Sequence, residues 1–256
     1  MRKKLALLFV LMLFCVHSAA AGEGRTFNGS FTPNTNGGKL LSLIVSFTKP
    51  EAVELRLDQE PDADGSVRNL HCLVTGAFIG GCRVEKLAIE AAFVEFNPPS
   101  GWDPSAENPL VVRKTLRTNF EAIVLEKDIN RALMEYTGKD WTGISVDLKP
   151  GKINARGRYH VKSPSLTILA EVRSGLDLRE GKEIWLKDVF LKINHEDQTP
   201  VIREELQKIQ PIASLRNFPF PVTLGVLSID DRQMRIATRT APRPFEGIVY
   251  RYVRGS

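Results

Sequence analysis

The chain of 256 residues contains 43% hydrophobic and 25% charged residues, a balance typical of a globular protein with enough apolar material for a core. Its formal net charge of +5 falls to +2 without the first 21 residues, which hold three basic and no acidic side chains. A charge so close to balance gives no support to nucleic-acid binding.

Residues 1–21 have the order of a cleavable secretory signal peptide. Basic residues at positions 2–4 precede an uncharged apolar run, Leu5–Val16, and small residues close the segment at Ala21. Signal peptidase recognises this order, and the apolar run is shorter than the ~20 residues that span a bilayer. We therefore expect export across the inner membrane, with the mature protein in the periplasm or cell envelope.

Export would place the cysteines of the mature protein in an oxidising compartment. Removal of the signal leaves Cys72 and Cys82, on either side of the glycine pair Gly80–Gly81. Two cysteines that flank a turn in an exported chain predict one disulfide bond. The alternative, a nucleophilic Cys82 paired with His71, needs a free thiol in an oxidising compartment.

The first part of the mature chain combines irregular and strand-like segments. Residues 22–39 are rich in Gly, Asn, Thr and Pro and predict a flexible lead-in. The apolar cluster Leu40–Val45 fits either a helix or a strand, and strict alternation from Val53 to Asp58 predicts a strand with one buried face. Asn97–Pro109 is rich in proline and predicts an exposed loop.

Two amphipathic helices are predicted further along. Residues 126–136 place Ile129 and Leu133 on one face, and Thr137–Gly138 ends that helix. A second helix, residues 200–211, begins at a proline suited to a first helical turn and carries Ile202 and Leu206.

The remaining segments after residue 140 alternate apolar and polar residues and are separated by short turns, which predicts an antiparallel sheet. Residues 240–256 contain several arginines and two prolines and predict a loosely held basic tail. Residues 40–239 are then expected to form a single domain.

The residues that carry chemistry are sparse. His71, His160 and His195 are scattered without a metal-ligand spacing, and no Gly-x-Ser-x-Gly motif occurs. Arg156 and Arg158 fit a solvated sheet face better than a phosphate site. We predict that the protein is not an enzyme and uses no cofactor or metal.

Three stretches resemble the LmeA-type family of exported phospholipid-binding proteins: Ala77–Glu90, Leu125–Leu133 and Asn217–Leu224. In that family the second stretch begins a helix with an Asp-hydrophobic-Asn core, and the third is a proline-flanked entry to the last hairpin. The resemblance extends over roughly Val53 to Thr238. The cysteine pair, the proline-rich loop and the basic tail depart from the family.

The resemblance implies an α+β fold in which a long curved antiparallel β-sheet wraps around one or two amphipathic helices, similar to tubular lipid-binding domains. It also implies that phospholipid, or another acyl-chain ligand, is bound or shuttled in an apolar groove between sheet and helices, with transient contact to a membrane surface. The candidate groove residues are Ile129, Leu133, Val146, Leu148, Leu166, Ile168, Leu191, Ile193, Ile202, Leu206, Val222 and Leu224. The alternative is a non-enzymatic structural or scaffolding envelope protein with a closed core.

Overall fold

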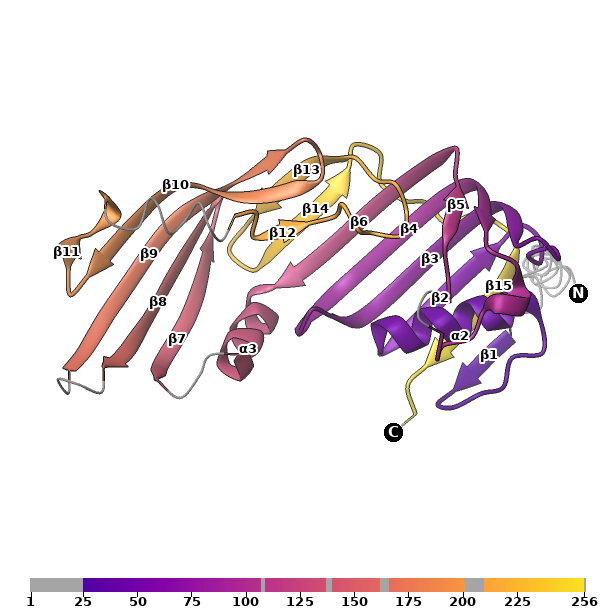
Figure 1. The fold of residues 1–256 in the computed structure, drawn as a ribbon, viewed down its shortest axis with the longest axis horizontal. Helices are drawn as coiled ribbons and strands as arrows, with labels where there is room; N and C mark the ends of the chain where they lie inside the picture. The colour runs from indigo at the N-terminus through magenta and orange to yellow at the C-terminus, as the bar shows by residue number, and fades with distance from the viewer. Residues whose placement is uncertain (1–24, 107–108, 137–139, 162–165, 201–209, 256) are drawn as a thin grey trace, which may run out of the picture.

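The computed structural model describes residues 25–106, 109–136, 140–161, 166–200 and 210–255. They form two open β-sheets and the α-helices α2 and α3, arranged as an elongated molecule (Figure 1). None of the helices in these ranges has the length and apolar character needed to cross a membrane.

The large sheet has nine strands in the order β1-β15-β2-β3-β4-β6-β14-β13, with β5 paired to β4. Its strand pairs are antiparallel, except that β1 and β15 are parallel. The bounds are β1 Arg25–Asn28, β2 Ala52–Leu57, β3 Ser66–Ile79, β4 Cys82–Phe96, β5 Val112–Lys114, β6 Arg117–Leu125, β13 Leu224–Ile229, β14 Gln233–Thr238 and β15 Ile248–Val253.

The small sheet has six strands in the order β11-β10-β9-β8-β7, with β12 paired to β10, and its pairs are antiparallel. The bounds are β7 Trp141–Lys149, β8 Lys152–Val161, β9 Leu166–Arg179, β10 Glu183–Ile193, β11 Glu196–Asp197 and β12 Ala213–Ser214.

Helix α2 (Asn36–Thr48) covers one face of the large sheet and supplies much of its core. The side chain of Thr35 caps the helix by accepting a 3.1 Å hydrogen bond from the backbone N–H of Gly38. Leu41 and Leu43 are fully buried, as is Leu55 on β2. The apolar cluster that fitted either helix or strand is therefore a helix.

Both ends of the described chain are ordered parts of the large sheet. The predicted flexible lead-in contains β1 and the first turn of α2, and the predicted loose tail contains β15, which lies between β1 and β2. The tail prediction overlooked the β-branched and aromatic residues at 248–253, a composition typical of strands. The two predictions are wrong for these segments.

The proline-rich segment is also ordered where it is described. It contains a single 3-10 turn, Pro99–Gly101, and the Trp102 side chain is 6% exposed. The indole N–H donates a 2.9 Å hydrogen bond to the Asn97 carbonyl, and the ring packs edge-on against Phe96, with ring centroids 5.8 Å apart. The exposed-loop prediction is wrong at Trp102.

The predicted sheet-dominated α+β class is confirmed. The strands form two sheets rather than one, because the chain leaves the large sheet after β6, builds the small sheet, and returns with β13 and β14. The predicted helix 200–211 falls largely on residues 201–209, outside the described ranges.

Candidate functional site

Helix α3 (Glu126–Tyr136) has the bounds predicted from the sequence and joins the two sheets. The Asn130 amide donates to the Val146 carbonyl at 2.8 Å and accepts from the Val146 N–H at 2.6 Å. The Glu126 carboxylate accepts from the N–H of Leu148 at 2.8 Å. These bonds satisfy backbone groups of β7, which is an edge strand of the small sheet among the described residues.

An apolar cluster lies beneath this junction. Val146, Leu148 and Ile229 are buried, and Ile129 and Leu133 of α3 pack against them. Four of the predicted groove residues, two from the helix and two from β7, are thus brought together.

The strand register gives the small sheet one apolar face. Residues paired directly across antiparallel strands share a face, and alternate residues along a strand do too. We call this face the apolar strip, and it consists of Trp141, Val146, Leu148, Ile153, Ala155, Gly157, Tyr159, Val161, Leu166, Ile168, Ala170, Val172, Leu191 and Ile193, with Ser174 as its polar member.

The apolar strip is covered at one end and open at the other. Near α3, Val146 and Leu148 are 8% and 0% exposed, whereas Trp141 and Leu166 at the far end are 38% and 46% exposed. The Trp141 ring lies 5.2 Å from that of Tyr159, between centroids. The open end is therefore an aromatic and aliphatic surface that solvent reaches.

The other predicted groove residues divide into three groups. Leu191 is buried on the strip, and Ile168 and Ile193 are half-buried on it. Val222 and Leu224 belong to the main core of the large sheet, so assigning them to the same groove is wrong. Ile202 and Leu206 lie outside the described residues.

The opposite face of the small sheet is largely polar, and a cavity of about 580 Å³ lies there beside α3. Its lining also includes Val146, Ala155 and Val172 of the apolar strip. Arg156, Glu171 and Lys192 occupy one row across β8, β9 and β10, so that opposite charges alternate from strand to strand. This arrangement fits the solvated face predicted for Arg156, and it does not collect positive charge as a phosphate site requires.

A second cavity of about 560 Å³ lies where α3, the end of α2, the β3–β4 turn and the end of β15 converge. Arg83 lies against it and donates to both carboxylate oxygens of Glu51 at 2.8 Å. It also donates to Glu85 at 2.5 Å and to the buried Asp128 of α3 at 3.0 Å. The hydrogen bond from Arg83 lowers the pKa of Glu51, and the cluster ties α3 to the large sheet.

The cysteines do not form the predicted disulfide. Both thiols are free, and β4 pairs Cys82 with Ile79, seven positions beyond Cys72 on β3. At the usual rise of a strand, this separation is about 23 Å, far beyond the reach of a disulfide. The Gly80–Gly81 turn is present, but it joins the long strands β3 and β4, and Cys72 lies far along β3 from the turn.

In the protein without residues 1–21, we expect one thiol to react in the folded state and two in denaturant. Cys72 is buried, which raises its pKa to about 12. Cys82 is half-buried, and burial together with the Asp128 charge raises its pKa too, so it should react slowly. Mass spectrometry after iodoacetamide treatment at one pH measures the number of reactive thiols. If the denatured protein has no reactive thiol before reduction, the two cysteines form a disulfide and this prediction is wrong.

The histidines occupy separate places. His71 is 5% exposed on β3, and burial lowers its pKa. His160 lies on the polar face, between the hydroxyls of Thr142 and Thr167 at 2.9 and 3.0 Å. The Nδ1 atom of His195 lies 3.6 Å from the carboxylate oxygen Oε2 of Glu171. Within the described ranges, no three metal-ligating side chains gather at one point.

Comparison of the chain with protein-family models, with curated proteins and with solved structures gives no match.

Proposed function

We propose that the protein is an exported, LmeA-like phospholipid-binding protein whose ligand lays its acyl chains on the apolar strip. The observation that carries this proposal is the half-covered state of the strip, which is buried beside α3 and solvent-exposed at Trp141 and Leu166. An apolar face left open on a protein surface is typical of a binding site for an apolar partner.

The dimensions of the strip suit an acyl chain. From Leu166 to Ser174 along β9, it extends about 26 Å at the usual rise of a strand. Burial of each methylene contributes about 0.8 kcal/mol, so ten methylenes offset much of the freedom that a bound lipid loses. In this proposal α3 and Leu133 close one end of the groove, and the polar face opposite keeps the sheet soluble.

Lipid extraction of the purified protein, followed by mass spectrometry, tests the proposal. Leu166→Arg should lower the amount of bound phospholipid several-fold, because it places a charge on the open end of the strip at a position that tolerates solvent. Leu116→Arg, 75% exposed and outside the strip, is the matched control and should retain the native amount.

Transfer of a fluorescent phospholipid from liposomes gives a second readout with the same pair of variants. A native protein that contains no lipid and accepts none would overturn the proposal and favour the closed-core scaffolding protein.

A further inference from the structure

Large apolar side chains that solvent reaches are concentrated on one long edge of the molecule. Of the eleven such residues in the described ranges, seven lie at this edge, which we call the apolar edge: Phe47, Phe78, Ile79, Met134, Trp141, Leu166 and Val253. Each is at or near the end of a helix or strand, so the edge is a line of tips rather than a sheet face.

The fold places the ends of these helices and strands along the same edge of the molecule. Figure 1 shows the β3–β4 turn, the ends of α2 and α3, and the starts of β7 and β9 along the lower edge as drawn. The second cavity supports this placement for α2, β3, α3 and β15, which all contribute to its lining. Leu116, by contrast, precedes β6 at the opposite edge (Figure 1).

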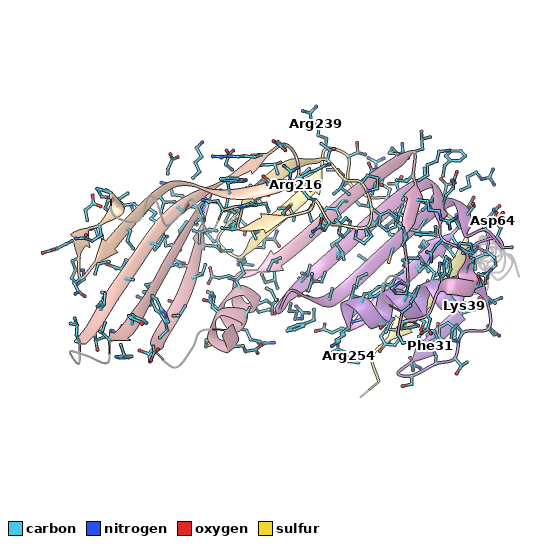
Figure 2. The ribbon with its side chains drawn as sticks, in the orientation of Figure 1. Phe31, Lys39, Asp64, Arg216, Arg239 and Arg254 are labelled. Atoms are coloured by element: carbon cyan, nitrogen blue, oxygen red, sulfur yellow. The ribbon has the colours of Figure 1, made fainter. Side chains whose placement is uncertain are left out.

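Exposed cations accompany the apolar edge. Lys49, Lys127, Arg131 and Arg254 are exposed there. Arg254 donates to the backbone carbonyls of Lys49 and Pro50, and the charges of Lys127 and Arg254 help to lower the pKa of Glu51. Figure 2 shows Arg254 at this edge, close to the lower end of the molecule. Arg83 is bonded to the carboxylates of Glu51, Glu85 and Asp128, and Glu135 is an exposed carboxylate that lines the same cavity. With Arg83 and the four exposed cations, five positive groups therefore stand beside four carboxylates, a small positive excess.

We propose that the apolar edge docks on a bilayer surface that contains anionic phospholipid. Its apolar tips would enter the interfacial layer while the four cations meet lipid phosphates, the combination that holds peripheral proteins on membranes. The four exposed cations and the small positive excess favour an anionic membrane as the occupant, and a line of separate tips fits a flat, deformable surface better than a shaped protein partner. The inference rests on the proposed phospholipid binding.

The apolar edge also connects with the apolar strip. Trp141 and Leu166 belong to both, since they stand at the open end of the strip and at the edge itself. A docked molecule therefore presents the open end of its groove to the bilayer, which gives a lipid a path between the two without crossing water.

Co-sedimentation with vesicles of phosphatidylcholine and phosphatidylglycerol tests docking. The double substitution Phe78→Ser with Ile79→Ser should weaken vesicle binding about tenfold, because two apolar tips no longer enter the interface. Arg131→Glu with Arg254→Glu should weaken it at least tenfold on these vesicles, and much less on pure phosphatidylcholine. The controls Leu116→Ser and Lys114→Glu, outside this edge, should bind like the native protein.

Binding of a monomeric short-chain phospholipid in solution separates docking from ligand binding. Edge variants that keep this binding but lose the vesicles support docking. Edge variants that sediment like the native protein overturn docking, whatever they bind in solution. Loss of vesicle binding in the variants, with no short-chain lipid bound by any form, supports docking and overturns the proposed function. A native dimer that the edge variants convert to monomers, with vesicle binding unchanged, also overturns docking.

Discussion

Tyr250→Ala is expected to destabilise the protein by about 3–5 kcal/mol, although the sequence places this residue in a predicted loose tail. Tyr250 is fully buried on β15, under the start of α2. The Tyr250 ring packs directly against the backbone of Gly37, because a Cβ atom added at Gly37 would come within 2.6 Å of the ring. The hydroxyl also bonds to the Glu60 carboxylate and lies 2.9 Å from the Thr35 hydroxyl.

Urea unfolding followed by circular dichroism measures the effect. Arg251→Ala is the matched control, because Arg251 is the next residue on β15 and its side chain is 45% exposed. Tyr250→Phe keeps the ring and removes only the hydroxyl, so it should cost about 1 kcal/mol or somewhat more. Equal stability of Tyr250→Ala and Arg251→Ala would mean that β15 is not an integral strand.

Elements with a regular local pattern are predictable from this sequence. Helix α3 has the predicted bounds because its apolar residues recur at helical spacing. Strands β7 to β10 were predictable because apolar and polar residues alternate on them, which is the pattern of a sheet with one polar face.

Strand β15 is harder to predict because its burial does not alternate. Val249 and Tyr250 are adjacent and both buried, so the period of two is broken where the strand packs on both sides. Its partners are also distant in sequence, since Tyr250 pairs with Arg25 on one side and Leu55 on the other. Local periodicity contains no information about such pairings.

The same limit explains the groove residues. Alternation shows that Leu224 and Leu191 each have a buried face, but it does not show which of two sheets buries them. The motif Asp128-Ile129-Asn130 lies at the junction, where Asp128 is bonded to the large sheet and Asn130 to the small one, but the sequence alone predicted only a helix there. Arg83 had no signal in the sequence, since two of its three carboxylate partners, Glu51 and Asp128, come from separate segments.

Arg83→Met is expected to cost about 3–5 kcal/mol, the usual effect of removing one partner from a buried ion pair. The Asp128 carboxylate is 1% exposed, and one of its oxygens has no hydrogen-bond partner among the described residues. Without the guanidinium, the other oxygen loses its 3.0 Å bond as well, which leaves a buried charge uncompensated. Because Asp128 is on α3, the loss should also loosen the helix that joins the two sheets.

Thermal and urea unfolding of four proteins test this prediction as a double-mutant cycle: the native chain, Arg83→Met, Asp128→Asn and the double variant. The Arg83 substitution should cost far less when Asp128 is already neutral, with a coupling of about 2–3 kcal/mol. Arg68→Met is the matched control, because Arg68 pairs with Asp58 at 2.9 Å but its side chain is 63% exposed, and exposed pairs contribute at most about 1 kcal/mol. A cycle with no coupling would show that Arg83 stabilises the protein through Glu51 and Glu85 alone, and that α3 is held to the large sheet by its apolar contacts.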